Sequence, residues 1–151
     1  MHPDFKELLV EFNAHRVEYL VVGAHALAAH GHVRATKDID VWVHATPQNA
    51  RRVKAALLAF GAALHGASLE ELSEPDFMLQ LGVAPVRVDI LTSITAVRFE
   101  EAWASRLQTI FDGEPVGVLS REHLIANKTA TARPQDLADV DTLKRLTGGQ
   151  P

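Results

Sequence analysis

Residues 21–43 constrain the fold more strongly than any other part of this chain. An apolar run ends at Gly23, a short helical segment and a polar turn follow, and a second apolar run carries Asp38 and Asp40. Side chains of a strand alternate between two faces, so these aspartates share one face and the residue after each of them points the other way. At about 6.5 Å along the strand, two carboxylates can reach the same one or two hard cations.

A third aspartate, Asp89, lies in another apolar segment, residues 86–91. Alternation places Arg87 and Asp89 on one face of this strand and the aliphatic residues around them on the other. We expect no direct pair between Arg87 and Asp89, because they lie two residues apart on that face. If the two acidic strands are neighbours in one sheet, three carboxylates converge and repel one another unless cations lie between them.

An isolated Asp-x-Asp sequence has an ordinary alternative interpretation, a solvated strand start or a turn. The strongly apolar flanks and the third aspartate favour a metal site instead. A site of carboxylates alone suits Mg²⁺ or Mn²⁺ better than zinc. Two such ions commonly assist attack on a nucleotide α-phosphate, and Gly23 at a strand-to-helix turn offers N–H groups to a triphosphate.

Composition limits the class of protein. The chain of 151 residues is expected to form one domain, and its 47% apolar and 23% charged residues are typical of a soluble globular protein. A net charge of −4 argues against broad non-specific nucleic-acid binding, and the absence of cysteine excludes disulfides, thiolate zinc sites and cysteine nucleophiles. We expect a cytoplasmic protein, because neither a signal peptide nor a membrane-length apolar run is visible.

Hydrophobic periodicity and turn residues predict an α/β chain. The expected helices are 3–15, 24–30, 47–60, 68–72, 95–106, 120–132 and a last one that begins at Pro134. The expected strands are 19–22, 38–43, 77–81, 86–91, 109–111 and 116–119, with one antiparallel hairpin across a loop at 82–85 and a second one around 112–114. In the last helix the residues expected to face inward are Leu137, Val140, Leu143 and Leu146.

The order Gly23-Ala24, Asp38-Ile39-Asp40 and Asp89 resembles the nucleotidyltransferase superfamily with the DNA polymerase β-like fold. Within it, the string HGHVRATKDID that ends at Asp40 is similar to AbiEii/MenT-type toxin nucleotidyltransferases and their small uncharacterised relatives. Residues 124–139 are similar to later helices of that group. The resemblance implies an α+β fold with a small mixed sheet flanked by helices. It implies one domain over 1–151, a catalytic core at about 17–95 and a C-terminal helical part at about 119–147.

The resemblance also implies an activity, the Mg²⁺- or Mn²⁺-dependent transfer of a nucleoside monophosphate from an NTP to a hydroxyl. The acceptor would be an RNA 3′ end such as that of tRNA, a protein or a small molecule, and the chain would belong to a toxin–antitoxin pair with a partner protein. The implied metal ligands and catalytic residues are Asp38, Asp40 and Asp89, of which Asp89 also helps to deprotonate the acceptor. The implied nucleotide-binding residues are Gly23, Ala24, Arg34, Thr36 and Lys128.

Ala24 departs from the family pattern, which has Gly or Ser at this position. This departure and the short chain motivate an alternative, a catalytically weak member that binds a nucleotide or a partner protein. A further alternative is an α/β domain whose aspartates have no catalytic role.

Several other residues have interpretations that the sequence leaves open. Trp42 shares the face of the aspartates and either stacks on a base or is buried. Lys128 either binds a phosphate or solvates a helix face. Arg133 pairs either with Asp136 or with Asp139. The histidines that lack a clean spacing for a metal cluster are His25, His30 and His32.

Overall fold

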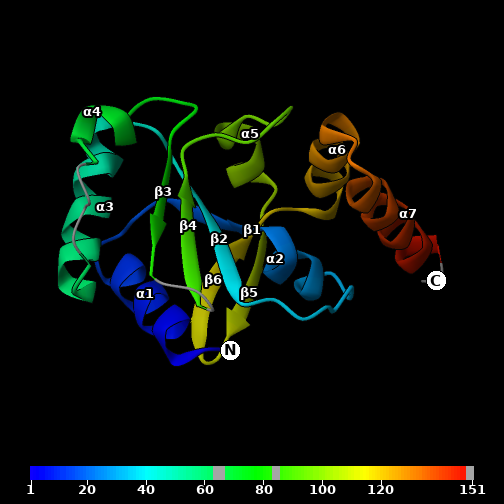
Figure 1. Ribbon diagram of the computed structural model, residues 1–151, viewed down its shortest axis with the longest axis horizontal. Helices are drawn as coiled ribbons and strands as arrows, with labels where there is room; N and C mark the ends of the chain where they lie inside the picture. Colours follow the sequence, from blue (N-terminus) through cyan, green and yellow to red (C-terminus); the bar gives the residue numbers. More distant parts are fainter. Residues whose placement is uncertain (63–66, 83–85, 149–151) are drawn as a thin grey trace.

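A mixed β-sheet forms the centre of the molecule (Figure 1). The computed structural model describes residues 1–62, 67–82 and 86–148. Within these ranges, six strands form one sheet in the order β3-β4-β2-β1-β6-β5. The strands are β1 (Tyr19–Val22), β2 (Asp38–Val43), β3 (Met78–Leu81), β4 (Arg87–Leu91), β5 (Leu107–Phe111) and β6 (Glu114–Val118). β2 runs parallel to β4 and antiparallel to β1, and β1 runs parallel to β6.

Helices cover both faces of this sheet. They are α1 (Pro3–Ala14), α2 (Gly23–Ala29), α3 (Pro47–Phe60), α4 (Leu69–Leu72), α5 (Phe99–Ala104), α6 (Arg121–Thr131) and α7 (Pro134–Gly148). Figure 1 shows α1, α3 and α4 on one side, and α2, α5 and the C-terminal pair of α6 and α7 on the other. None of the helices in the described ranges is long and apolar enough to span a membrane.

Ring contacts show which face of the sheet carries the aspartates. Phe12 of α1 packs against Tyr19 with ring centroids 5.3 Å apart, so α1 covers the face of Tyr19 and of its register partner Val43. Asp38, Asp40 and Trp42 therefore occupy the opposite face. Trp42 is 2% exposed and packs edge-on against Phe99 of α5, with centroids 5.1 Å apart. Of its two interpretations, burial is the correct one.

Most of the predicted elements are confirmed. All six strands are present, and β3–β4 and β5–β6 are antiparallel hairpins. Residues 83–85 of the predicted 82–85 loop lie outside the described residues. The predicted signals of α3 are also found, because the Thr46 side chain accepts a hydrogen bond from the Asn49 N–H and Gly61 ends the helix with φ 93°.

Two predictions are wrong. The helix expected at 95–106 is shorter, since a bridge joins Ile94 to Val97 and Ala96 has φ 67°, which delays the helix until Phe99. Leu137 is also 49% exposed, although it was expected to face inward with Val140, Leu143 and Leu146. Charged partners from other elements turn a different side of α7 inward, and this side carries two aspartates that are described below.

This orientation of α7 is testable by truncation. Leu143 is 0% exposed, so Leu143→Ala is expected to lower the free energy of unfolding by about 2–5 kcal/mol through the cavity that it leaves. Leu137→Ala is the matched control and is expected to change it by no more than about 0.5 kcal/mol. Urea denaturation of both variants measures the difference, and an equal loss in both variants would contradict this orientation of α7.

Candidate active site

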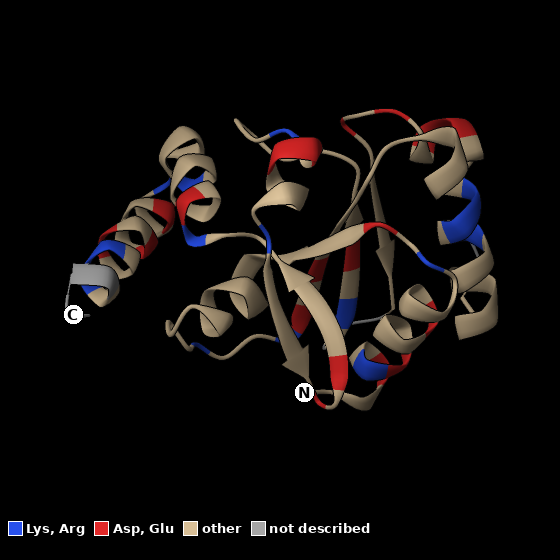
Figure 2. Ribbon diagram, turned by 180° about the vertical axis from the view of Figure 1, so that it is seen from behind, with Lys and Arg blue, Asp and Glu red and all other residues tan. Residues whose placement is uncertain are grey.

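The pairing of β2 with β4 brings the three predicted aspartates together. These strands are adjacent, as predicted, and run parallel, with Asp38 opposite Arg87 and Asp40 opposite Asp89. Side chains of register partners project from the same face of a sheet, so the four residues form a cluster of three carboxylates and one guanidinium. Figure 2 shows the acidic segments of the two strands side by side, with a basic segment next to them.

Asp40 and Asp89 repel each other within this cluster. Burial, and then the neighbouring charge of Asp89, raise the pKa of Asp40 to about 6. Asp38 acts in the same direction, and Arg87 opposes it. Asp89 is only 8% exposed, and its Oδ1 is buried without a hydrogen-bond partner. A divalent cation would relieve both the repulsion and the missing contact.

Arg87 contacts two of the three carboxylates. Its Nη2 lies 3.3 Å from Asp38 Oδ2, and its Nε lies 3.3 Å from Asp89 Oδ1. The prediction that Arg87 and Asp89 do not meet is therefore wrong, because the long Arg side chain spans the two-residue spacing along the strand.

Among the described residues, no three His, Asp or Glu side chains already surround one metal position. The donors nevertheless fit Mg²⁺ or Mn²⁺, since all are carboxylate oxygens and one is buried without a hydrogen bond.

Gly23 lets the start of α2 approach the cluster. Its φ is +70°, a value that L side chains rarely adopt, and a Cβ atom at this position would overlap the Asp40 carboxylate. A glycine is therefore required here both by the backbone and by the neighbouring aspartate. The backbone turn at Gly23 and Ala24 consequently lies directly beside Asp40.

A cavity of about 430 Å³ opens next to the carboxylates. The structure brings all five predicted nucleotide-binding residues to its wall, together with Asp38 and Asp40. The lining residues are Gly23, Ala24, Arg34, Ala35, Thr36, Asp38, Asp40, Lys128, Arg133, Gln135 and Asp136. This volume lies within the range of roughly 300–1,000 Å³ that is usual for ligand pockets.

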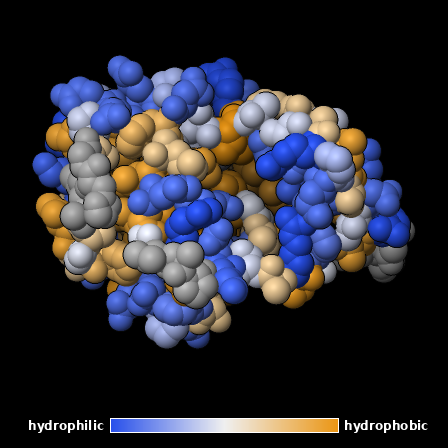
Figure 3. Space-filling model, viewed as in Figure 1, coloured by the Kyte–Doolittle hydropathy of each residue, from blue (hydrophilic) through white to orange (hydrophobic). Residues whose placement is uncertain are grey.

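A smaller cavity of about 260 Å³ shares Gly23, Asp40 and Lys128 with the first one. It also shares Arg133 and Asp136, and the rest of its wall is mixed. Val22, Leu91, Ile94 and Leu124 are apolar, whereas Asn127 and Thr131 are polar. Figure 3 shows the hollow between the C-terminal helices and the body of the molecule, with hydrophobic residues in its floor. Two further cavities, of about 440 and 420 Å³, are lined by none of the three clustered aspartates. The two cavities around Asp40 are therefore the ones that matter for its chemistry.

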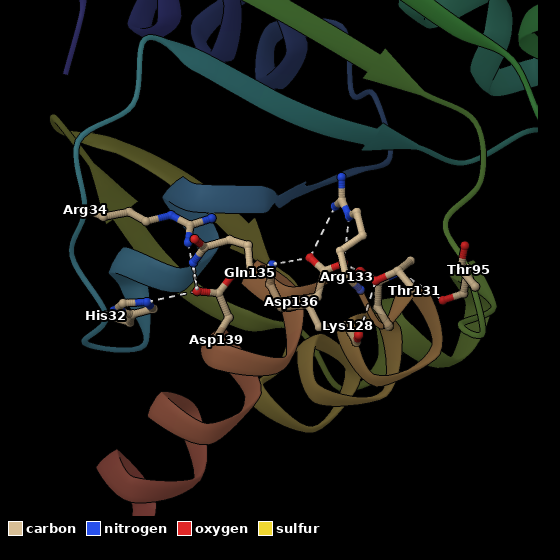
Figure 4. A network of polar contacts seen from close by, with 10 residues as sticks. His32, Arg34, Thr95, Lys128, Thr131, Arg133, Gln135, Asp136 and Asp139 are labelled. Carbon is tan, nitrogen blue, oxygen red and sulfur yellow. Dashed lines mark hydrogen bonds and ion pairs between the residues drawn. The ribbon is translucent and has the colours of Figure 1, made fainter.

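Lys128 reaches the first cavity from within a buried ion network (Figure 4). It is 8% exposed, and its Nζ lies 2.9 Å from Asp139 Oδ2 and 3.6 Å from Asp136 Oδ1. Asp139 is 0% exposed and also accepts hydrogen bonds from Arg34 (2.8 Å) and Gln135 (3.1 Å). The network thus holds Lys128 and Arg34, from distant parts of the chain, at the same cavity.

The protonation of the two aspartates on α7 agrees with this pairing. Burial by itself would raise the pKa of Asp139, but Lys128, Gln135 and His32 lower it overall. Hydrogen bonds from Arg133 hold the pKa of Asp136 far below its usual value. Arg133 Nε lies 2.7 Å from Asp136 Oδ2, so Asp136 is the partner of Arg133. Both carboxylates stay charged and keep their cationic partners in place.

The contacts of Asp139 with Lys128 and Arg34 were not predicted from the sequence. The sequence offered one signal, because Gln135, Asp136 and Asp139 are spaced to lie along one side of a helix, shortly after Lys128.

The histidines have separate surroundings. His30 Nε2 lies 2.8 Å from the Leu119 carbonyl oxygen, and His32 Nε2 lies 3.1 Å from Asp139 Oδ1.

A mixed sheet with a glycine turn beside two acidic strands is the arrangement expected from the resemblance to nucleotidyltransferases. The chain belongs to the family described as nucleotidyltransferase of unknown function (DUF6036), which matches residues 4–145. No curated protein matches the sequence.

Solved structures share the fold at low sequence identity. TM1012 of Thermotoga maritima, a proposed nucleotidyltransferase, has 15% identity and a TM-score of 0.59, and covers 97% of this chain and 91% of its own. The lincosamide antibiotic adenylyltransferase LnuA, solved with lincomycin, has 17% identity and a TM-score of 0.62, with coverage of 97% and 98%. The antibiotic-resistance factor ANT(2'')-Ia has 17% identity and a TM-score of 0.62, with coverage of 95% and 80%. The predicted fold class is thus confirmed.

Gly23→Ala tests the close approach of α2 to Asp40. The left-handed φ costs about 1–2 kcal/mol for a residue with a Cβ atom, and the overlap with the Asp40 carboxylate adds to this. We expect Gly23→Ala to cost less, by about 1 kcal/mol, in an Asp40→Ala background, where the carboxylate is gone. A double-mutant cycle by urea denaturation measures this coupling, and purely additive losses would contradict it.

The raised pKa of Asp40 predicts a pH-dependent stability of the metal-free protein. A carboxyl group with a raised folded-state pKa stabilises the fold below its unfolded pKa of about 3.9, and this contribution is lost as pH rises through about 6. In EDTA, Asp40→Asn is therefore expected to be more stable than the wild type by about 1–3 kcal/mol at about pH 7.5, and nearly equal at about pH 4. The control Asp141→Asn changes a side chain that is 70% exposed and should show no such trend.

Proposed function

We propose that this protein transfers a nucleoside monophosphate from an NTP to a hydroxyl group, with Mg²⁺ or Mn²⁺ as cofactor. The observation that carries the proposal is that Asp40, which pairs in register with Asp89, lines the same cavity as Arg34 and Lys128. A cluster of carboxylates and two basic side chains on one cavity suit a nucleotide triphosphate with its divalent ion.

The larger cavity is proposed to hold the nucleotide. The N–H groups of Gly23 and Ala24 and the side chains of Arg34 and Lys128 would contact the triphosphate, and Thr36 would contact the nucleotide. Lys128 would act as a point charge on a phosphate, because its position is fixed by Asp139. Asp38, Asp40 and Asp89 would hold the divalent ion, which neutralises charge that develops on the α-phosphate when it is bound.

The transfer step follows from these positions. The acceptor oxygen forms a bond to the α-phosphorus while the bond from that phosphorus to the oxygen bridging it to the β-phosphate breaks. Pyrophosphate leaves with its negative charge near Arg34 and Lys128. Asp89, the register partner of Asp40, would take the proton of the acceptor hydroxyl, the role that the resemblance implies for it.

A small-molecule hydroxyl is the acceptor that the second cavity favours. Its volume of about 260 Å³ and its apolar residues Leu91 and Leu124 suit a small molecule rather than a polynucleotide. LnuA is an adenylyltransferase of lincosamides, and ANT(2'')-Ia has been solved with adenylyl-2''-tobramycin, so two proteins of this fold modify small molecules. An RNA 3′ end and a protein are the other acceptors that the similarity to AbiEii/MenT-type toxins implies. The same similarity implies a partner protein. We also propose a cytoplasmic location, where the NTP substrate is present.

A second candidate function is nucleotide or partner binding without efficient transfer. Ala24 supplies no hydroxyl to a phosphate, and Lys128 is already engaged by Asp139 at 2.9 Å. Such a protein would be stabilised by NTP and Mg²⁺ but would transfer no label.

A labelling screen separates the two candidates. The protein is incubated with each NTP labelled at the α-phosphate, with Mg²⁺ or Mn²⁺, and with tRNA, a protein lysate or a panel of hydroxylated small molecules. We expect label in one acceptor class and a loss of at least about a hundredfold in Asp40→Asn or in EDTA. The matched control is Asp141→Asn, which should keep the wild-type rate. Equal labelling by wild type and Asp40→Asn would contradict the mechanism, and NTP binding without label would favour the second candidate.

A further inference from the structure

Arg87 is the cationic member of the carboxylate cluster. It lies opposite Asp38 in the parallel register and two residues before Asp89 on the same strand face. Its Nη2 donates a hydrogen bond of 3.3 Å to Asp38 Oδ2, while its Nε lies 3.3 Å from Asp89 Oδ1 without the geometry of a hydrogen bond. Electrostatic attraction, more than hydrogen bonding, therefore holds the guanidinium against Asp89.

The backbone fixes this position. The Arg87 N–H donates a hydrogen bond of 3.2 Å to the Lys37 carbonyl oxygen, which joins β4 to the residue before β2. Arg87 is half-exposed, at 40% of its side chain, whereas the Asp89 side chain is 11% exposed. A guanidinium also stays charged at any physiological pH, unlike a histidine or a buried lysine. Arg87 is thus a permanent positive charge at the open side of the cluster.

The charge of the cluster decides how many divalent ions it can balance. Three ionised carboxylates and one guanidinium leave two negative charges, which one divalent ion neutralises. A second divalent ion would give the cluster a net positive charge and would lie close to Arg87. We infer that Arg87 takes the place of one divalent cation, so that the protein without nucleotide binds one metal ion at Asp38, Asp40 and Asp89.

This inference rests on the metal site of the proposed function, but it concerns Arg87 alone. As a positioning residue, Arg87 offsets the repulsion between Asp38 and Asp89 in the absence of metal and limits the number of divalent ions that bind. A second ion would then arrive only with the triphosphate, whose own negative charges balance it. An ordinary structural ion pair would instead affect stability and leave metal binding unchanged.

Counting Mn²⁺ ions on the nucleotide-free protein tests the inference. Isothermal titration calorimetry and the electron paramagnetic resonance signal of free Mn²⁺ give the stoichiometry and the affinity. Wild type is expected to bind one ion per chain, and Asp40→Asn is expected to lose it, which places that ion at the cluster. Arg87→Met keeps the length of the side chain without its charge. It is expected to bind a second ion, or to bind the first about tenfold more tightly.

Arg87→Lys is the matched control, because it keeps the positive charge and should retain one ion. Thermal unfolding establishes that each variant is folded, and Arg87→Gln replaces Arg87→Met if the latter is not. The inference is overturned if wild type binds two ions or none, or if the neutral variants bind Mn²⁺ as wild type does.

Nucleotidyl transfer is measured separately. Label transfer by the wild type, together with unchanged Mn²⁺ binding in Arg87→Met, would refute this role of Arg87 and keep the proposed function. The expected change in Mn²⁺ binding, together with no label transfer by the wild type, would refute the proposed function alone.

Discussion

The parallel pairing of β2 with β4 is the interaction on which the candidate site depends. These strands are separated in sequence by α3, α4 and β3, and only their register sets Asp40 beside Asp89. On the opposite face of the same strands, Ile39 and Ile90 are 0% exposed. A slip of one residue would move these apolar side chains to the aspartate face and the aspartates into the core, so burial of the apolar face fixes the carboxylate cluster.

A buried ion network imposes the second constraint. Asp139 is 0% exposed, and a buried charge is very costly unless it is paired. Its partners Lys128 and Arg34 come from α6 and from the connection before β2, so pairing them docks the C-terminal helices against the sheet. The same cations line the larger cavity. Stability and the placement of positive charge at the candidate site therefore have one physical cause.

Local signals predicted the elements well, and long-range pairing explains where they failed. Thr46 and Gly61 bounded α3 correctly because capping depends on neighbouring residues. Leu137 was misplaced because the inward side of α7 is chosen by Lys128 and Arg34, far away in the sequence. The contact of Arg87 with Asp89 was missed for another reason, since strand alternation describes faces and not the reach of a long side chain.

The sequence by itself determined the strands, the acidic positions at 38, 40 and 89, and the glycine at 23, because alternation and backbone conformation are properties of a few consecutive residues. The resemblance that these positions carry also named the nucleotidyltransferase class, which the family match confirms. Only the tertiary structure decided that Arg87 enters the carboxylate cluster and that Asp139 holds Lys128 and Arg34 at one cavity. Those contacts join separate elements, and their geometry is fixed only when the sheet register and helix docking bury their charges together.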